Sequence, residues 1–300
     1  MKTRIKDLAY CLKVDKNILI QLTTDLDIDE SKFYNNWDEP KTDERGLPRF
    51  DDNGIALTRP INAPIKRLKI VQSLLLHNVL YKSKLPNYFF GGLKNKDAVM
   101  NGRHHQGNKF FFLTDLKDFY PSVSSSSVEK ALRKEGFYPD VARLITRICT
   151  KEGAIPQGCP TSSYLAALVV YHSCDNIFQK YISEGFKVSV YVDDITISNS
   201  IDFKLRTPKI LDELRERGLK INFAKTHYCT KTPKVTGVLI KNNGILPLPH
   251  TFASAVDPNK TENSRKGHME RIKYVKKISK QKISRHNKNS DLHPLSEEFL

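Results

Sequence analysis

The chain has 300 residues, 39% of them hydrophobic and 27% charged, which suits one large domain or two subdomains and excludes a wholly disordered chain. Its 49 basic and 33 acidic residues leave a formal net charge of +16, which favours a polyanionic partner, nucleic acid before a membrane. No apolar run reaches the roughly 18 residues of a membrane span. With no signal-peptide core in residues 1–8 and five scattered cysteines, we expect a reduced cytoplasmic protein without disulfides, a zinc site or a membrane partner.

In the first part of the chain, apolar spacing predicts helices over residues 4–28 and 64–81. The segment 35–58 between them is polar and turn-rich, and its Asp-Asn-Gly stretch at 52–54 predicts a hairpin turn. Residues 86–108 have the composition of a loop. A short aromatic strand is then expected over 110–113, with Asp115 just past its end.

The rest of the chain alternates between helical and strand patterns. We expect helices over 126–150, broken at Gly136 and Pro139, a long apolar helix over 162–182, and a helix over 208–217. Strands are predicted over 187–192, 195–198 and 234–240. Residues 260–288 hold eleven basic and two acidic side chains, a local charge near +9.

Three carboxylates form the strongest chemical signal. Asp193 and Asp194 lie between two β-branched runs, as at the tip of a hairpin, and Asp115 follows another strand. Three clustered carboxylates supply the hard oxygen ligands that two Mg²⁺ ions, or Mn²⁺, require for phosphoryl transfer. An isolated Asp-Asp pair more often makes only a polar turn, so the flanking strands carry this interpretation.

The segments around these carboxylates resemble the ordered blocks of reverse transcriptases. Tyr191-Val192-Asp193-Asp194 resembles the YxDD motif. The remaining blocks appear in the family's order: the fingers over 59–72, the first catalytic-aspartate block over 111–123, PQGxPxS over 155–163, the lysine block over 218–226 and the primer grip over 235–240.

Two short signatures resemble the retron branch of that family. Asn101-Gly102-Arg103-His104-His105 is similar to its NAxxH signature, with glycine where alanine is usual, and Val235-Thr236-Gly237 is similar to its VTG triplet. The resemblance points to retron-type or other defence-associated bacterial enzymes. Residues 241–300 then predict a shorter thumb than a typical retron enzyme has.

The resemblance implies an α+β right-hand polymerase fold. Its parts would be an N-terminal helical region and fingers over 1–108, a palm with an antiparallel sheet over 109–240, and a short basic thumb over 241–300. Asp115, Asp193 and Asp194 would be the catalytic metal ligands. The nucleotide-binding residues would be Arg59 at the triphosphate, Tyr120 under the sugar, Gln157 at the sugar, and Lys225 at the leaving pyrophosphate.

The basic segments and the two signatures would contact nucleic acid. Cationic side chains can clamp the phosphate backbone of an RNA–DNA hybrid without reading its sequence. The expected contact residues are Lys94, Lys96, His105, Thr236, Gly237, Lys266, Arg271 and Lys273.

The resemblance therefore implies an RNA-directed DNA polymerase that uses dNTPs to copy a dedicated structured non-coding RNA, in a retron or another anti-phage system with an effector protein as a further partner. Two alternatives stay open from sequence. The first is a protein-primed or untemplated DNA polymerase, since twelve tyrosines offer hydroxyl groups. The second is a non-catalytic RNA-binding scaffold on a polymerase fold, although clustered carboxylates would repel the ligand of a pure binder.

Overall fold

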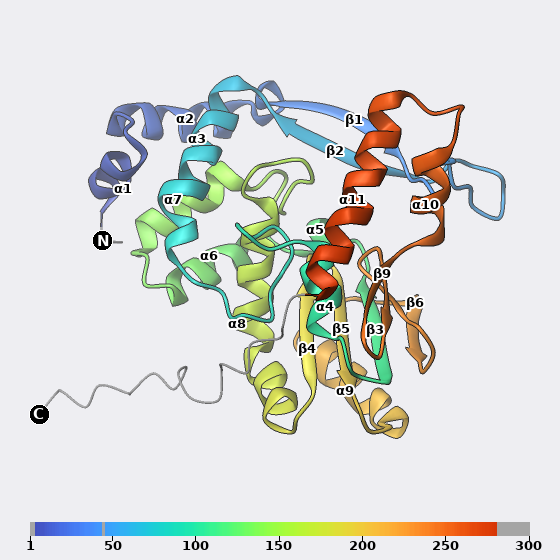
Figure 1. The fold of residues 1–300 in the computed structure, drawn as a ribbon. Coiled ribbons are helices and arrows are strands. Elements are labelled where there is room, and N and C mark those ends of the chain that lie inside the picture. Colours follow the sequence, from blue (N-terminus) through green and yellow to red (C-terminus); the bar gives the residue numbers. More distant parts are fainter. Residues whose placement is uncertain (1–3, 44–45, 281–300) are drawn as a thin grey trace, which may run out of the picture.

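The computed structural model describes residues 4–43 and 46–280. Its N-terminal part consists of helices packed beside a long hairpin, which runs along the top of the molecule (Figure 1). The elements are α1 (Ile5–Leu12), α2 (Lys16–Ile28), the 3₁₀ turn η1 (Glu30–Phe33), β1 (Tyr34–Pro40), β2 (Thr58–Pro64), α3 (Lys66–Asn78) and the 3₁₀ turn η2 (Leu80–Lys82).

The helix predicted over 4–28 is two helices. Lys13 takes a left-handed φ of 53° and ends α1, and the Asp15 side chain accepts the Asn17 N–H at 2.7 Å to cap α2. Residues 35–58 hold the predicted hairpin turn, with the Gly54 N–H donating to the Asp51 carbonyl at 3.1 Å. The strands β1 and β2 on either side were not predicted, because β1 is exposed after its first residue and neither strand alternates regularly between buried and exposed residues.

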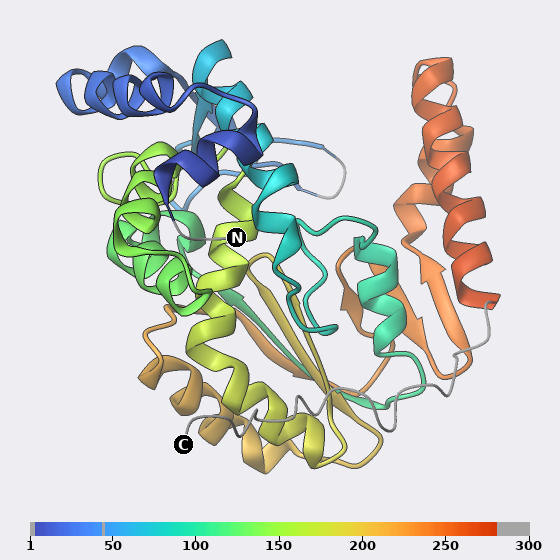
Figure 2. The same cartoon turned by 90° about the vertical axis from the view of Figure 1, so that its left-hand side faces the viewer.

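The centre of the molecule is a four-stranded antiparallel sheet in the order β4-β5-β3-β6. Its strands are β3 (Phe110–Leu116), β4 (Lys187–Tyr191), β5 (Asp194–Asn199) and β6 (Ile221–Cys229). The helices α8 (Ser162–Ser183) and α9 (Thr207–Glu216) cover one face of this sheet, and the 3₁₀ turn η3 (Lys204–Arg206) precedes α9 (Figures 1 and 2). These strands and helices match the predicted ones within a few residues, except that β6 was not predicted.

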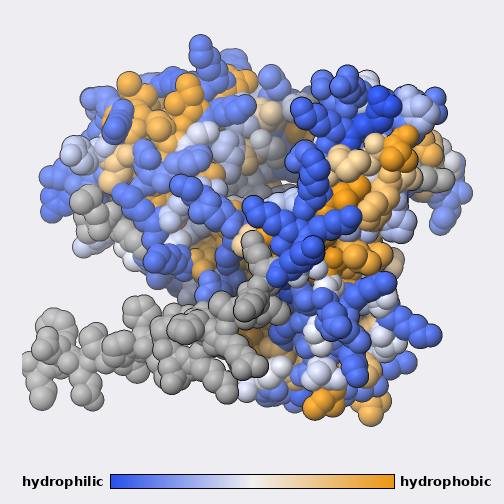
Figure 3. Space-filling view, viewed as in Figure 1, coloured by the Kyte–Doolittle hydropathy of each residue, from blue (hydrophilic) through white to orange (hydrophobic). Residues whose placement is uncertain are grey.

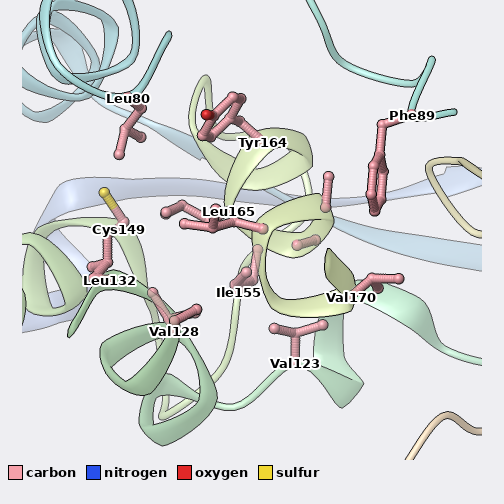
Figure 4. Close-up of a cluster of buried hydrophobic side chains, with 14 of the residues drawn as sticks. Leu80, Phe89, Val123, Val128, Leu132, Cys149, Ile155, Tyr164, Leu165 and Val170 are labelled. Carbon is pink, nitrogen blue, oxygen red and sulfur yellow. The ribbon is translucent and has the colours of Figure 1, made fainter. Parts of the chain in front are cut away.

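The largest hydrophobic core joins this sheet to the N-terminal helices. The short helix α5 (Phe119–Ser122) precedes α6 (Ser125–Lys134), which packs on α8, while α7 (Pro139–Cys149) packs on α6 and α2, with the break at Gly136 and Pro139 as predicted. Leu132, Cys149 and Leu165 are among its fully buried side chains (Figure 4). Because this core spans residues 8 to 221 of the chain, it fixes the elements that carry the carboxylates on one scaffold.

A second, smaller core lies on the other side of the sheet. It joins α4 (Ala98–His104) to the sheet β7 (Lys234–Val235), β8 (Val238–Lys241) and β9 (Gly244–Pro247) and to the helix α11 (Glu262–Lys280), with Val99, Val238 and Val275 at its centre. The short helix α10 (Pro249–Val256) packs beside α11. Here two predictions were wrong: residues 86–108 contain α4, and residues 234–240 form two strands joined by a tight turn rather than one strand.

The mixture of helices and antiparallel sheets confirms the predicted α+β class. Within the described part of the chain, no helix is long and apolar enough to cross a membrane. The five cysteines, all of which lie in the described part of the chain, form no disulfide there.

Candidate active site

Asp115, Asp193 and Asp194 lie together at one end of the central sheet. Asp115 on β3 pairs directly with Asp194 on β5, and one carboxylate oxygen from each of the three aspartates lies within 4.8 Å of the others. Asp115 is inside β3 rather than past its end, and only 7% of it is exposed. The sequence-predicted cluster is therefore brought together by the pairing of two strands.

The turn that carries Asp193 is strained. Val192 has a φ of 58°, a left-handed conformation that a β-branched residue rarely adopts. Gly91 packs against this turn so closely that a Cβ there would lie 2.3 Å from the Val192 nitrogen. The Asp193 carbonyl accepts the Leu116 N–H at 2.9 Å, which joins the turn to the end of β3. These contacts hold the strained turn in place, and Gly91 was not singled out from sequence.

The cluster is short of compensating charge. Burial, followed by the neighbouring Asp115 carboxylate, raises the pKa of Asp193 above its ordinary value. Burial and the carboxylates of Asp193 and Asp115 raise the pKa of Asp194 to about 7. Desolvated carboxylates that repel one another are a binding site for divalent cations, because a cation removes the repulsion and supplies the missing counter-charge.

An irregularity in β6 places two further side chains on Asp115. The β3–β6 register shifts between Leu113 and Asp115, and Lys225 lies in the shifted segment. Its Nζ lies 2.7 Å from Asp115 Oδ2, while the Asn222 amide donates to Oδ1 at 2.8 Å. Lys225 was predicted to bind nucleotide, and Asn222 was missed because nothing in its local pattern indicates a partner 107 residues away.

The other residues predicted to bind nucleotide lie on separate elements. Tyr120 is half-buried, and its hydroxyl lies 2.8 Å from Ser163 Oγ at the start of α8. Burial raises the pKa of Tyr120, with Asp193 among the charges that add to the shift. The Gln157 carbonyl accepts the Asn62 N–H at 2.7 Å, which joins its turn to β2. Arg59 lies on β2 itself and forms an ion pair with Glu39 at 2.7 Å, so it reaches a triphosphate only by leaving that partner.

The two retron-like signatures contact each other. Thr236 and Gly237 have φ values of 41° and 82° and make the tight turn between β7 and β8. The Thr236 hydroxyl donates to the Ala98 carbonyl at 2.7 Å and accepts the Asn101 amide at 3.1 Å, which ties this turn to α4. A Cβ on Gly237 would lie 3.3 Å from the Arg271 guanidinium, so α11 lies directly beside the same turn.

The structure contradicts one predicted nucleic-acid contact, His105, and places another, Lys96, in a half-buried position. His105 is fully buried, and its two ring nitrogens lie 2.7 Å from the hydroxyls of Ser198 and Ser189. Burial holds its pKa well below the usual range, so it is a neutral structural residue without a surface for RNA. Lys96 is half-buried, and its Nζ donates to the carbonyls of Asn87 and Phe89 at 2.9 and 2.8 Å, which fixes the preceding loop.

The remaining predicted contacts lie on the surface. Lys94 is exposed in the loop before α4, and Lys266, Arg271 and Lys273 are exposed on α11. Lys273 forms an exposed ion pair with Glu270 at 2.9 Å. Hydrophilic side chains follow α11 across the face in Figure 3, with apolar ones beside them. Residues 281–288 of the predicted basic segment, and the rest of the predicted thumb to residue 300, lie outside the described residues.

One buried and two half-buried carboxylates at the end of an antiparallel sheet, beside a lysine and a tyrosine, have the arrangement typical of metal-dependent phosphoryl-transfer sites. Residues 42–240 match the family described as reverse transcriptase (RNA-dependent DNA polymerase). Because this match covers well over half of the chain, the protein belongs to the reverse transcriptase family.

Several curated proteins are similar to the same region. The Retron Se72 reverse transcriptase of Salmonella heidelberg is 32% identical over 197 residues, which is 61% of this chain and 52% of that protein. The Retron Ec86 reverse transcriptase of Escherichia coli is 30% identical over 194 residues, 62% of this chain and 60% of that protein. The Retron Mx162 reverse transcriptase of Myxococcus xanthus is 24% identical over 253 residues, 73% of this chain and 49% of that protein. The chain thus spans about half to three fifths of the length of these relatives.

Proposed function

We propose that the protein is an RNA-directed DNA polymerase of retron type, which copies a dedicated structured non-coding RNA into DNA from dNTPs. The observation that carries this proposal is the meeting of Asp115, Asp193 and Asp194 within 4.8 Å, inside a chain of the reverse transcriptase family. The similarity to retron enzymes, together with the contact between the two retron-like signatures, supports the retron assignment.

In this proposal the three carboxylates hold two Mg²⁺ ions, or Mn²⁺. The raised pKa values of Asp193 and Asp194 and the buried position of Asp115 fit a site whose charge is completed by cations. Bound there, the metals would stabilise the attacking and leaving oxygens of the transferred phosphoryl group. Asn222 and Lys225 orient the Asp115 carboxylate through its two oxygens.

The chain's own residues then place the substrate. Tyr120, held by its contact with Ser163, lies beneath the sugar of the incoming nucleotide. Gln157 contacts the same sugar from the turn that is joined to β2. Arg59 leaves its ion-pair partner Glu39 and binds the triphosphate. Its guanidinium group forms paired hydrogen bonds with phosphate oxygens at least as readily as with carboxylate oxygens. Lys225 supplies positive charge toward the leaving pyrophosphate.

We assign the parts of a right-hand polymerase on the same basis. The fingers and N-terminal helices would be residues 1–108, the palm residues 109–240, and the short basic thumb residues 241–300, with α11 as its main helix. The exposed side of α11 carries Lys266, Arg271 and Lys273 and would track the backbone of the RNA–DNA hybrid. A cytoplasmic location, an effector protein and the defence role belong to this proposal.

The decisive experiment is primer extension on an annealed RNA template and DNA primer with Mg²⁺. Asp193→Asn and Asp194→Asn should abolish DNA synthesis while RNA binding is retained, because the carboxylates serve metals rather than the core. Asp118→Asn is the matched control, since Asp118 is an exposed acid beside the same strand. Synthesis at wild-type rates by the Asp193 and Asp194 variants would refute the assignment.

Sequencing of nucleic acid that copurifies with the protein separates the alternatives. A DNA product complementary to one structured RNA supports the proposal. DNA that resists removal from the protein after denaturation would indicate protein priming, DNA without a template would indicate untemplated synthesis, and RNA alone would indicate a binding scaffold.

A further inference from the structure

A groove of about 370 Å³ lies between α6 and α8, outside the site described above. Its wall on α6 carries three cations, Lys130, Arg133 and Lys134, and its apolar lining includes Ala131 and Val169. The two helices lie side by side on the flank of the molecule turned toward the viewer in Figure 2. The proposed active site uses none of the groove's residues.

The three cations of this groove form no ion pair with an acid in the described part of the chain. Lys130 and Arg133 are exposed, and neither has an ion-pair partner within residues 4–43 and 46–280. Lys134 donates to the His172 carbonyl at 3.1 Å, which holds its ammonium group at the groove. The nearby carboxylate of Glu135 lies 2.9 Å from His172 Nε2 and leaves one negative charge beside the three cations. Because burial lowers the pKa of His172, its ring adds no charge of its own near neutral pH.

The spacing and lining of the groove match a nucleic-acid strand better than a compact anion. Lys130 and Lys134 are four residues apart on a helix, about 6 Å along its axis, so their ammonium groups can meet successive charges of an extended polyanion. The apolar surface of Ala131 and Val169 offers contact to sugars or bases, which an inorganic anion does not need. The volume is also several times that of a single bound water, so it admits part of a nucleotide.

The position of the groove connects it to the carboxylate cluster. Ser163, which contacts Tyr120, lies six residues before Val169 on α8, about 9 Å along the helix axis. The groove and the contact of Tyr120 with Ser163 therefore share one helix.

We propose that the α6–α8 groove is a second nucleic-acid contact, which binds the phosphate backbone of a single-stranded RNA segment through Lys130, Arg133 and Lys134. This inference takes the RNA partner from the proposed function. The groove holds RNA by charge and without sequence readout, and it fixes the path of the RNA along the outside of the enzyme.

The test measures binding of full-length protein to a fluorescent oligouridylate RNA at several salt concentrations, without dNTPs or Mg²⁺. The triple variant Lys130→Gln, Arg133→Gln, Lys134→Gln should lower the slope of log K against log salt by about 2, from about 0.7 for each lost contact to a single strand. The matched control, Lys204→Gln, Lys209→Gln, Arg217→Gln, removes three exposed charges around α9 and should leave the slope near that of the wild type.

Two further measurements keep the result unambiguous. The double variant Lys130→Glu, Arg133→Glu spares the Lys134–His172 contact and should also lower the slope, with an unchanged thermal midpoint. Photocrosslinking of 4-thiouridine RNA to the wild type should label peptides from α6 or α8. Equal slopes for the groove and control variants, or crosslinks confined to other segments, would overturn the inference. Binding of inorganic phosphate or of an acidic peptide in the groove in place of RNA would also overturn it.

A separate measurement distinguishes the groove from the proposed function. Extension of a short annealed primer should proceed at the wild-type rate in the groove variants. If the wild-type protein itself extends no primer, that result counts against the proposed function and not against the groove.

Discussion

Lys225 Nζ lies 2.7 Å from Asp115 Oδ2, and this ion pair is made by a lysine whose side chain is 53% exposed with an aspartate whose side chain is 9% exposed. The lysine reaches inward because the register of β6 shifts beside Asp115. Lys225 also acts to lower the pKa values of Asp193 and Asp194, against the larger effect of burial. It therefore supplies positive charge to the carboxylate cluster in the absence of a metal ion.

Replacement of Lys225 by glutamine should slow DNA synthesis more than it weakens nucleotide binding. Loss of a positioned proton donor or cation at the leaving group commonly costs about a hundredfold or more in rate. We expect kcat of primer extension to fall on that order, with partial recovery in Lys225→Arg, which restores charge without a readily donated proton. An unchanged kcat in Lys225→Gln would leave the lysine as an ion-pair partner of Asp115 alone.

The raised pKa of Asp194 predicts a pH-dependent stability of the metal-free protein. An aspartate whose pKa rises from 3.8 to about 7 on folding is disfavoured in its charged form, so stability falls as the pH rises between these values and stays low above about 7. Asp194→Asn removes this penalty. In the presence of a chelator, its thermal midpoint should exceed that of the wild type near pH 8, by about 2–4 °C per kcal/mol relieved.

That difference should shrink steadily as the pH falls from about 7 toward about 4, because the wild-type carboxyl is then protonated in the folded protein. Asp118→Asn controls for the change in net charge. A pH-independent difference between Asp194→Asn and the wild type would show that the carboxylates do not repel one another as the structure implies.

The ring of Tyr120 should select deoxyribonucleotides. Tyr120→Ala opens space beneath the sugar and should raise the ratio of kcat/KM for rNTPs to that for dNTPs by roughly ten- to two-hundredfold, the range of discrimination by shape in a packed pocket. Tyr120→Phe keeps the ring and loses only the contact with Ser163, so it should keep the selectivity. If alanine leaves the ratio unchanged, Tyr120 is a packing residue.

The chain has Gly102 where the NAxxH signature usually has alanine, and close packing against Val238 explains this difference. A Cβ at this position would lie 2.2 Å from the Val238 Cγ2 methyl group in the second core. Gly102→Ala should therefore destabilise the protein by about 1–3 kcal/mol, as overpacking does, measured by urea unfolding. Gly267→Ala on α11 is the matched control: a Cβ there meets open space, so it should be neutral or stabilise by up to about 1 kcal/mol.

Recovery of the stability in the double variant Gly102→Ala, Val238→Ala would identify the Val238 methyl group as the cause. A Gly102→Ala protein as stable as the wild type would mean that α4 and β8 can move apart at little cost.

Local sequence patterns determined the elements that carry their own signal. The apolar periods predicted α3 and α8, Gly136 and Pro139 predicted the break between α6 and α7, and the β-branched runs predicted the hairpin that carries Asp193 and Asp194. These predictions succeeded because each depends only on residues that lie close together in the sequence. The identity of the three carboxylates followed in the same way, from their position at strand ends and from the order of the family's blocks.

Only the tertiary structure decided which side chains those carboxylates meet and which residues are withdrawn from solvent. Asn222 reaches Asp115 across 107 residues, and Thr236 reaches Ala98 across 138. The same holds for His105, whose burial between Ser189 and Ser198 depends on strands 84 and 93 residues away. A local pattern carries no information about such partners, because strand register, the irregularity in β6 and the packing of α4 against β8 are set by contacts between distant segments. The sequence alone therefore predicted the three carboxylates, and the long-range packing decided how they are positioned and which neighbouring side chains remain exposed.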